Sequence, residues 1–445
     1  MSLSVIILAA GKGTRMKSQM PKVMHKIAGS EMINLVIKSA CHLNPQNISI
    51  VISQELEPFK EKIIKAHPNQ NISFILQNQR LGTAHAAKIA LEKIENLGEK
   101  TLILYGDTPL IESETLLKMS QKLENSAICV LCFHDSQPNS YGRLVINEKG
   151  SLEKIVEFKD ASESERKNTL CNSGVMGFDG KKIREILAQI DNKNAANEFY
   201  LTDAVAIARK NNLICDFLET EISEVLGANS RGELAALEEI LQNKIRQKMM
   251  DAGVTLIDPK SVFFSPDTHI ENDVIVHPNV IFQGKVEIEK NCEIKSFSHI
   301  EDTKISAGCV VGPFARLRPQ TILEEDVKIG NFVEIKKSQI KKGAKINHLS
   351  YVGDALIGKN SNIGAGTITC NYDGYRKSQT LIGENVFIGS NSALIAPVKI
   401  DDGVVVAAGS VVTKNGEKDE LIFARSKQVN LKNGGKKFHD ARKKK

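Results

Sequence analysis

The spacing of apolar residues divides the chain into two halves, and the pattern changes near residue 252. In the first half, short runs rich in β-branched residues alternate with stretches such as HAAKIALEKIENL (85–97), whose apolar residues recur at helical spacing. The runs that predict strands are residues 4–8, 47–53, 71–76, 101–107 and 127–133. Because strands alternate with helices, this half predicts an α/β domain with a mostly parallel sheet and helices on both faces.

In the second half, apolar residues recur every six residues, except where one residue drops out. A period of six fits neither a helix nor a lone strand. It is typical of a hexapeptide parallel β-helix, in which each unit forms one side of a triangular coil and points its apolar residue to the axis. The predicted axial residues are Ile270, Val276, Phe282, Ile288, Ile294, Ile300, Ile305, Val311, Leu317, Leu323, Ile329, Ile335, Ile340, Ile346, Val352, Ile357, Ile363, Ile382, Ile388, Leu394, Ile400, Val406 and Val412.

Two segments do not follow either pattern. Residues 366–381, GTITCNYDGYRKSQTL, are polar and contain Gly374, so we expect them to leave the coil as a protruding loop, where functional residues often lie. Residues 228–251 carry leucine and isoleucine at helical spacing and predict one long helix. We expect this helix to link a domain at 1–227 to a domain at 252–445.

Composition and charge narrow the class of protein. A chain of 445 residues with 41% hydrophobic and 25% charged residues is typical of a globular protein with two or more domains. No apolar window approaches the roughly 18 residues that span a bilayer, so we expect no membrane insertion. The apolar run near the N-terminus lacks a basic leader and runs into a glycine turn, so we interpret it as a first strand and not as a signal peptide.

The net charge of +6 comes from the C-terminal tail, residues 425–445, whose nine Lys and Arg residues against one Asp give +8. The rest of the chain therefore sums to about −2, which does not predict a nucleic-acid-binding face. We expect a solvated, partly disordered tail; contact with an anionic ligand or partner is the alternative.

The eight cysteines lie mostly in apolar runs, which predicts buried, reduced thiols in a cytoplasmic protein. Cys129 and Cys132 form a lone C-x-x-C pair whose spacing directs the two side chains to opposite faces of a strand. No second pair follows at zinc spacing, so we expect no metal or redox role for them.

The stretch LAAGKGTRM (8–16) follows the first predicted strand. It is not a dinucleotide fingerprint, because Met16 stands at the third glycine position, and the Walker spacing is absent. Backbone amides of such a turn can face phosphate oxygens, and Arg15 and Lys22 can add positive charge where a polyphosphate departs. The alternative is an ordinary tight turn with two surface bases.

Together with later motifs, this stretch resembles the signature of the sugar-1-phosphate nucleotidyltransferases. The supporting motifs are LGTAHA (81–86), LYGDTPL (104–110), YGR (141–143), IVEFKDA (155–161), NSGVMGF (172–178) and EFYLTD (198–203). With the six-residue repeat behind them, residues 4–425 resemble the bacterial family of bifunctional N-acetylglucosamine-1-phosphate uridylyltransferases / glucosamine-1-phosphate N-acetyltransferases. The resemblance implies a Rossmann-like nucleotidyltransferase domain joined by a long helix to a left-handed parallel β-helix.

The resemblance also implies residue roles in the first domain. The nucleotide would contact Leu8, Ala9, Ala10, Gly11, Lys22, Gln77, Gly82 and Thr83, with Arg15 and Lys22 on the triphosphate. The sugar phosphate would contact Tyr105, Gly142, Glu157, Asn172 and Asn229. Asp107 and Asn229 would bind Mg²⁺.

The residue types suit uridylyl transfer from UTP. The attacking sugar phosphate oxygen is already anionic, so the task is to position and neutralise two anions, not to remove a proton. Asp107 follows a predicted strand, at the edge where α/β sheets bind ligands, and Mg²⁺ prefers oxygen ligands. A turn residue is the alternative for Asp107, and a helix N-cap is the alternative for Asn229.

Four motifs of the second half match the acetyltransferase part of the same family: GPFARLRP (312–319), GNFVEIKKS (330–338), NHLSYVGDALIG (347–358) and NIGAGTITCNYDG (362–374). They imply that glucosamine-1-phosphate is held by Arg318, Lys336, Tyr351, Asn362 and Lys377, with His348 as general base. Acetyl-CoA would contact Ala365, Asn371, Tyr372, Ser390, Ala408 and Arg425. Histidine can take the amine proton near neutral pH.

The family resemblance further implies a cytoplasmic homotrimer that makes UDP-N-acetylglucosamine for peptidoglycan and lipopolysaccharide, including lipid A.

Three alternative interpretations of the sequence stay open. The β-helix could be structural or regulatory in a monofunctional nucleotidyltransferase, the chain could resemble translation-factor subunits without sugar turnover, or the coil could be a zinc hydratase, which needs three histidines per site.

Overall fold

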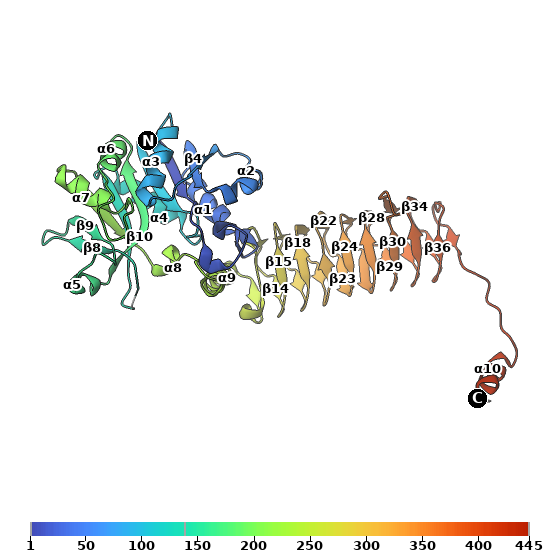
Figure 1. The fold of residues 1–445 in the computed structure, drawn as a ribbon. Helices are drawn as coiled ribbons and strands as arrows, with labels where there is room; N and C mark the ends of the chain where they lie inside the picture. Colours follow the sequence, from blue (N-terminus) through green and yellow to red (C-terminus); the bar gives the residue numbers. More distant parts are fainter. Residues whose placement is uncertain (1, 138, 444–445) are drawn as a thin grey trace. The chain divides into compact units, whose positions relative to one another are not determined.

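The computed structural model describes residues 2–137 and 139–443, and the chain divides into two compact units, Met1–Gln242 and Asn243–Lys445 (Figure 1). Each unit is described by itself. Among the described residues, no helix has the length and apolar character needed to cross a bilayer.

The first unit is built on one twisted sheet whose strand order is β11-β7-β10-β6-β1-β4-β5. The strands are β1 (Leu3–Leu8), β4 (Asn47–Ile52), β5 (Ile72–Leu76), β6 (Lys100–Tyr105), β7 (Ile128–His134), β10 (Leu170–Asp179) and β11 (Cys215–Glu219). All pairings are parallel except those of β10, which runs antiparallel between β6 and β7. The mostly parallel sheet predicted from the sequence is confirmed.

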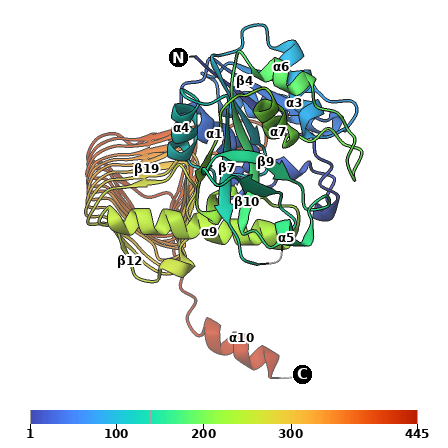
Figure 2. The same cartoon turned by 90° about the vertical axis from the view of Figure 1, so that its left-hand side faces the viewer.

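Helices cover both faces of this sheet (Figure 2). The helices α3 (Thr83–Lys93), α6 (Ile183–Ala188) and α7 (Asp203–Lys210) pack on the face that carries Ile6 and Leu8. The helices α1 (Met32–Cys41), α2 (Lys60–Ala66) and α4 (Ser113–Lys122) pack on the face that carries Val5 and Ile7. The alternation of β1 residues between the two cores follows from the two-residue period of a strand.

The eight cysteines are all free, and Cys129 and Cys132 of β7 face opposite cores, as predicted. Burial raises the pKa of both thiols to about 12, which keeps them protonated. They behave as packing residues.

An antiparallel pair of strands branches from β10, in the interior of the main sheet. It consists of β8 (Arg143–Ile146) and β9 (Leu152–Val156), and β8 also meets β10 where Arg143 pairs with Cys171. The short helix α5 (Glu163–Arg166) follows, with a capping box between Ser162 and Glu165. This pair and the residues after it frame two of the cavities described below.

The helix predicted over residues 228–251 begins later than expected, as α9 (Arg231–Asp251). The Ser230 hydroxyl accepts a 3.2 Å hydrogen bond from the Glu233 amide and so caps the first turn. The cap therefore belongs to Ser230, and the Asn229 side chain is left for another contact.

The second unit is a parallel β-helix formed by three sheets, and Figure 2 looks nearly along its axis. The first sheet stacks β12 (Thr255–Leu256), β14 (Ile275–Val276), β17 (Glu293–Ile294), β20 (Val310–Val311), β23 (Lys328–Asn331), β26 (Lys345–His348), β29 (Asn362–Ile363), β32 (Phe387–Ile388), β35 (Val405–Val406) and β37 (Leu421–Ile422). The second stacks β13 (His269–Ile270), β16 (Glu287–Ile288), β19 (Thr303–Ile305), β22 (Thr321–Leu323), β25 (Gln339–Ile340), β28 (Ala355–Ile357), β31 (Thr380–Ile382) and β34 (Val398–Ile400). The third stacks β15 (Ile281–Gln283), β18 (His299–Glu301), β21 (Arg316–Leu317), β24 (Glu334–Lys336), β27 (Tyr351–Gly353), β30 (Ile368–Cys370), β33 (Ala393–Ile395) and β36 (Val411–Val412).

Every residue predicted to point to the axis is buried in one continuous core, and none is more than 3% exposed. The predicted coil of hexapeptide repeats is confirmed, and its parallel sheets are consistent with the left-handed winding expected from the resemblance.

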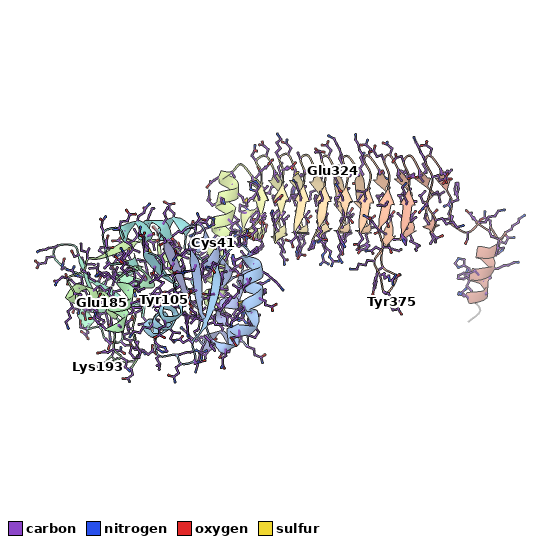
Figure 3. All side chains as sticks on the ribbon, turned by 90° about the horizontal axis from the view of Figure 1, so that it is seen from above. Cys41, Tyr105, Glu185, Lys193, Glu324 and Tyr375 are labelled. Atoms are coloured by element: carbon purple, nitrogen blue, oxygen red, sulfur yellow. The ribbon has the colours of Figure 1, made fainter. Side chains whose placement is uncertain are left out.

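The protruding loop is shorter than predicted. Ile368–Cys370 and Thr380–Ile382 remain in the coil as β30 and β31, so the excursion covers residues 371–379. Thr369 occupies the axial position, is 1% exposed, and its hydroxyl forms hydrogen bonds with the Gly353 backbone. A search for apolar residues misses this axial position because threonine is polar. Tyr375, 94% exposed, stands at the tip of the loop (Figure 3).

The basic tail carries the helix α10 (Gly434–Arg442), which the sequence reading did not predict. Its side chains are exposed, as expected for a solvated segment. The last two lysines of the tail, residues 444–445, lie outside the described residues.

Candidate active sites

The first cavity of the α/β unit, about 340 Å³, opens beside the carboxyl ends of β1 and β6. Parallel sheets bind ligands at this edge because the loops that leave neighbouring strands meet there. All eight residues predicted to contact the nucleotide line it: Leu8, Ala9, Ala10, Gly11, Lys22, Gln77, Gly82 and Thr83. Arg15 lies in the short turn Thr14–Met16, is exposed, and is not among the lining residues.

Two glycines let the backbone close around this cavity. A Cβ on Gly13 would lie 2.7 Å from the Cβ of Lys22, so only glycine lets the turn approach that lysine. Gly82, at φ +117° and ψ 173°, precedes α3 in a backbone region that is almost confined to glycine, and a Cβ there would lie 2.4 Å from the Phe199 carbonyl oxygen.

The Lys22 ammonium joins two residues that the sequence resemblance assigned to a metal ion. Its Nζ donates to Oδ2 of Asp107, which follows β6, and to Oδ1 of Asn229 at 2.9 Å. The side chains of Lys22 and Asp107 are only 13% and 16% exposed. A carboxylate oxygen and an amide oxygen therefore converge on one cation at the rim of the cavity, and this donor set suits a hard divalent cation such as Mg²⁺.

A second cavity, about 310 Å³, adjoins the first and shares Thr83, Tyr105 and Glu198 with it. Four of the five residues predicted to hold the sugar line it: Tyr105, Gly142, Glu157 and Asn172. The fifth, Asn229, is not among its lining residues and instead contacts Lys22. The shared wall means that ligands in the two cavities would be immediate neighbours.

Burial raises the pKa of two acidic groups that line the second cavity. Burial, with the negative charges of Glu157 and Asp107, raises the pKa of the Tyr105 phenol, which therefore stays a neutral hydrogen-bond donor and acceptor. The Glu157 carboxylate accepts a 2.9 Å hydrogen bond from the Thr202 hydroxyl. Its pKa is nevertheless raised, first by burial and then by the charges of Asp160 and Glu198.

Sequence reasoning did not assign roles to several residues around these cavities. Glu198 lines both cavities and Thr202 holds Glu157, although both lie in the quoted motif EFYLTD. Arg80 donates from Nε to the Ala10 carbonyl at 2.7 Å and lines the first cavity. Their positions in or next to the motifs LGTAHA and EFYLTD could have indicated a role in the sequence. Their contacts could not be predicted, because they form only in the folded chain.

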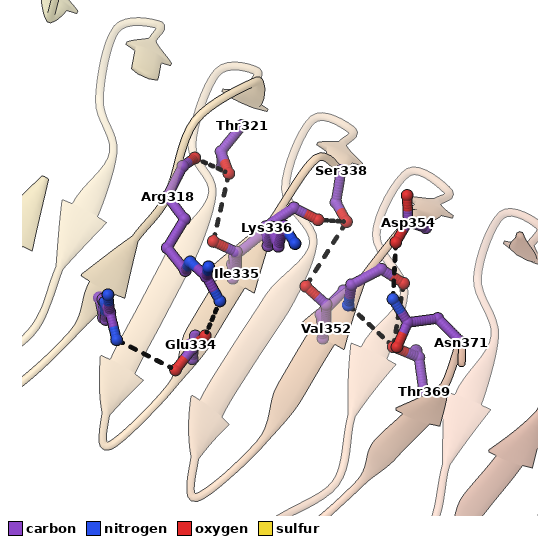
Figure 4. Close-up of polar contacts among 12 residues, drawn as sticks. Arg318, Thr321, Glu334, Ile335, Lys336, Ser338, Val352, Asp354, Thr369 and Asn371 are labelled. Carbon is purple, nitrogen blue, oxygen red and sulfur yellow. Dashed lines mark hydrogen bonds and ion pairs between the residues drawn. The ribbon is translucent and has the colours of Figure 1, made fainter. Parts of the chain in front are cut away.

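In the β-helix, two of the residues predicted to bind the second sugar phosphate, Arg318 and Lys336, lie along the third sheet (Figure 4). Arg318 and Lys336 follow the paired residues Leu317 and Ile335, so they lie on adjacent coils. Arg318 donates from Nη1 to Glu334 at 2.8 Å. The ammonium of Lys377, from the protruding loop, lies beside Lys336 and lowers its pKa, with a smaller effect of Arg318.

Tyr351 and Asn371 complete this group. A Cβ on Gly353 would lie 2.5 Å from the Tyr351 hydroxyl and 2.9 Å from Nδ2 of Asn371, so both side chains cross the strand at Gly353. Gly353 pairs with Lys336 in the register of the sheet. Asn371 Nδ2 also donates to Asp354 at 2.6 Å, a contact visible in Figure 4. Tyr372 lies in the loop, 59% exposed, with its hydroxyl bonded to the Gly374 carbonyl.

His348 stands at the end of β26, exposed on the outside of the coil. Its Nδ1 lies 2.7 Å from Oδ1 of Asn331, its register partner on β23. Since the amide oxygen can only accept, this contact assigns the proton to Nδ1 and leaves the lone pair on Nε2. Asn331 had no predicted role.

Several residues predicted to contact acetyl-CoA form a column with His348. Ile346, Ile363, Ile388 and Val406 are successive register partners, so the residues two positions later stack in turn: His348, Ala365, Ser390 and Ala408. Arg425 reaches this column by donating from Nη1 to the Ala408 carbonyl at 2.9 Å. Asn362 lies on β29 of the first sheet, whereas Lys336 and Tyr351 lie on the third sheet and Arg318 directly follows β21 of that sheet, so these residues lie on different sides of the β-helix.

Family profiles match both units. The profile described as nucleotidyl transferase matches residues 4–221, the one described as bacterial transferase hexapeptide (six repeats) matches residues 267–301, and the one described as GMPPB C-terminal domain matches residues 299–411. The fold and the sites therefore define a transferase in which a nucleotidyltransferase domain precedes a hexapeptide-repeat β-helix.

Similar proteins extend over nearly the whole chain. Bifunctional protein GlmU of Paramagnetospirillum magneticum is 46% identical over 98% of this chain and 96% of its own. The proteins of the same name from Sphingopyxis alaskensis and Zymomonas mobilis are 46% and 44% identical over 100% and 99% of this chain, and 98% of their own in both cases. The chain belongs to the family of bifunctional GlmU proteins. The predicted combination of nucleotidyltransferase and acyltransferase activities in one enzyme is confirmed.

Proposed function

We propose that the chain makes UDP-N-acetylglucosamine in two steps: residues 252–445 acetylate glucosamine-1-phosphate from acetyl-CoA, and residues 1–227 transfer UMP from UTP to the product. Residues 228–251 link the two. The observation that carries the first-domain assignment is the wall shared by two adjoining cavities, Thr83 and Tyr105, because a nucleotide in one places its phosphates beside a sugar phosphate in the other.

In uridylyl transfer, a phosphate oxygen of N-acetylglucosamine-1-phosphate attacks the α-phosphorus of UTP, and the bond to pyrophosphate breaks. The amides of the turn at Gly11 and the Lys22 ammonium bind the triphosphate, and Arg15 adds charge on the departing pyrophosphate. Tyr105, Gly142, Glu157 and Asn172 hold the sugar. Asp107 and Asn229 would hold Mg²⁺, which supplies neutralising charge to the phosphates when bound.

In acetyl transfer, the amine of glucosamine-1-phosphate attacks the thioester carbonyl, the C–S bond breaks, and CoA leaves. His348 takes the amine proton at Nε2, and the departing thiolate becomes the thiol by taking a proton. Arg318, Lys336 and Lys377 hold the sugar phosphate with Tyr351 and Asn362. Acetyl-CoA lies along the column of Ala365, Ser390 and Ala408, with Asn371, Tyr372 and Arg425 at its borders.

We also propose that the chain forms a homotrimer whose acetyl-transfer sites lie between subunits. Phe297, Phe314 and Phe332 are 54%, 44% and 55% exposed, and their rings stack at 4.9 and 5.1 Å along one corner of the coil. An exposed apolar ladder favours burial against another copy. The position of Asn362 on a different sheet from Arg318 fits a site completed by a neighbouring subunit. Light scattering after gel filtration should give three times the 48.9 kDa chain mass; the mass of a single chain would contradict the trimer.

The free cysteines and the proposed substrates favour a cytoplasmic enzyme that supplies peptidoglycan and lipopolysaccharide precursors.

One incubation tests both activities: glucosamine-1-phosphate, acetyl-CoA, UTP and Mg²⁺ should yield CoA and pyrophosphate. Lys22→Ala should reduce pyrophosphate release from supplied N-acetylglucosamine-1-phosphate and spare CoA release, and His348→Ala should do the reverse. A wild-type chain that releases pyrophosphate but no CoA would favour a monofunctional nucleotidyltransferase.

A separate experiment tests which nucleotide base the first domain prefers. Gln77 lines the nucleotide cavity at 6% exposure, with Nε2 3.1 Å from the His85 ring, so its amide is held for hydrogen bonding to a base edge. We expect UTP to support pyrophosphate release far better than ATP, CTP or GTP. Equal rates with all four would contradict uracil recognition.

A further inference from the structure

A third cavity of the α/β unit, about 410 Å³, is lined by Arg143, the residue after Gly142 of the proposed sugar pocket, and has no part in the activities above. Its lining includes the cations Arg143, Arg166 and Lys167, the carboxylate of Asp135, and the ring of Phe158. It shares no lining residue with the nucleotide cavity or the sugar cavity. Three cations against one anion give this small enclosure a net positive charge.

Arg143 is the central residue, because it is a charged side chain that is only 3% exposed. Its Nη1 donates to the Tyr141 carbonyl, and its buried Nε has no hydrogen-bond partner among the described residues. Burying a charged guanidinium without a carboxylate is costly, since the lost hydration is not replaced. Arg143 is therefore a buried hydrogen-bond donor with no anionic partner in the part of the chain that the structure describes.

A second guanidinium is brought to the same place by Phe158. The guanidinium carbons of Arg143 and Arg166 lie 5.8 and 4.7 Å from the centroid of that ring. Arg166 donates from Nε to the Phe158 carbonyl at 3.2 Å, which leaves its terminal nitrogens for other acceptors. Among the residues that the structure describes, neither arginine forms an ion pair.

Asp135, the one carboxylate of the lining, forms no ion pair with these cations among the described residues. Asp135 accepts 2.9 Å hydrogen bonds from the Gln137 amide and the Asn139 side chain, so both of its carboxylate oxygens bond to residues of the same loop. The charge of the cavity is therefore available to a ligand.

We propose that this cavity binds a phosphorylated small molecule, with its phosphate held between Arg143 and Arg166 and close to Lys167. Two planar guanidiniums and an ammonium match the several oxygens and the double charge of a phosphate monoester better than a single carboxylate. The volume leaves room for the body of the molecule beyond the phosphate. This cavity is separate from the proposed reaction sites, so phosphate binding to it can be tested without measuring enzyme turnover.

The site is linked to the sugar pocket through the backbone. Gly142 lines the sugar cavity, and the next residue, Arg143, lines the third cavity. The Gly142 carbonyl accepts a 2.8 Å hydrogen bond from the amide of Asn172, another residue of the sugar cavity. A ligand that binds Arg143 therefore restrains the backbone at Gly142, which forms one wall of the sugar pocket.

The chain contains no tryptophan, so Phe158→Trp in the full-length protein places a single indole reporter in the cavity. Titration with inorganic phosphate should change its emission saturably. Adding Arg166→Ala or Lys167→Ala, both exposed residues, should weaken the apparent affinity at least tenfold, whereas Lys159→Ala should leave it unchanged. Lys22→Ala, which removes a cation from the nucleotide cavity, should also leave the signal unchanged.

Hydrogen exchange of the unsubstituted chain tests the same site without the reporter. Inorganic phosphate should slow amide exchange in peptides that cover residues 139–146 and 163–170, and Arg166→Ala should remove this protection. The proposal is overturned if phosphate alters neither signal, or if both responses survive in Arg166→Ala.

Discussion

The imidazole of His348 and the amide of Asn331 are register partners on adjacent coils, and Nδ1 lies 2.7 Å from the amide oxygen. This contact orients the ring and leaves Nε2 as the basic nitrogen. Asn331 would touch the reaction only through the histidine, so it is a positioning residue.

Replacement of that partner should slow acetyl transfer without weakening substrate binding. In Asn331→Ala the ring loses the acceptor that selects its tautomer, and we expect kcat to fall roughly 10- to 100-fold with KM for glucosamine-1-phosphate nearly unchanged. Asn331→Asp should restore much of the rate and shift the pH profile of kcat upward, because a carboxylate stabilises the imidazolium. Initial rates of CoA release between pH 6 and 9 measure this.

The uridylyl-transfer rate of the same preparations is the control for folding. Unchanged kcat and pH profile in Asn331→Ala would show that the contact has no part in catalysis.

Chelation should separate the two activities. Asp107 and Asn229 are the oxygen donors proposed for Mg²⁺, whereas acetyl transfer is proposed to rely on His348 and on cationic side chains. EDTA should therefore abolish pyrophosphate release and leave CoA release within about twofold of its initial rate, and added Mg²⁺ should restore the lost activity. Loss of CoA release with EDTA would contradict the assignment of acetyl transfer to side chains alone.

The backbone at Gly82 should tolerate no side chain. Its φ of +117° is strained for any other residue, and an added Cβ would collide with the Phe199 backbone. We expect Gly82→Ala to reduce the free energy of unfolding by about 1–3 kcal/mol and to raise KM for UTP. Thermal and urea unfolding give the first value, and steady-state kinetics the second.

Gly11→Ala is the matched control, because a Cβ there meets nothing within 4 Å. Its unfolding midpoint should match that of the wild type. Equal stability of Gly82→Ala and Gly11→Ala would mean that the loop before α3 relaxes without cost.

Asp203 should make the α/β unit less stable as the pH rises. Burial raises the pKa of this carboxyl from 3.8 to about 6, with added repulsion from Asp191, Glu157 and Asp160. A raised pKa means that the folded state holds the proton more tightly, so its contribution to stability is present below pH 3.8 and is lost as the pH rises through 6. Asp203→Asn should therefore melt at a higher temperature than the wild type at pH 8.

At pH 4 the two proteins should melt together, since the carboxyl is largely protonated in the folded wild type. Scanning calorimetry or a dye-based melt at several pH values measures the difference. A difference of the same size at pH 4 and pH 8 would remove titration of Asp203 as its cause.

The sequence by itself determined the β-helix almost residue by residue. Each coil repeats the same local requirement, one small or branched apolar side chain per six residues, so spacing alone identifies axial positions such as Ile346 and Val406. Thr369 was missed because a hydroxyl that bonds to the neighbouring coil can occupy the same position. That bond exists only once the coils are stacked.

The family resemblance carried by the sequence motifs likewise indicated which residues line the nucleotide cavity. Only the tertiary structure decided which side chains meet. Lys22 and Asn229 are 207 positions apart, and nothing local to either residue predicts their contact. The pairing of His348 with Asn331 has the same origin, as does the lack of an ion-pair partner for Arg143 among the described residues: hydrogen bonding and burial depend on neighbours that folding brings from distant parts of the chain.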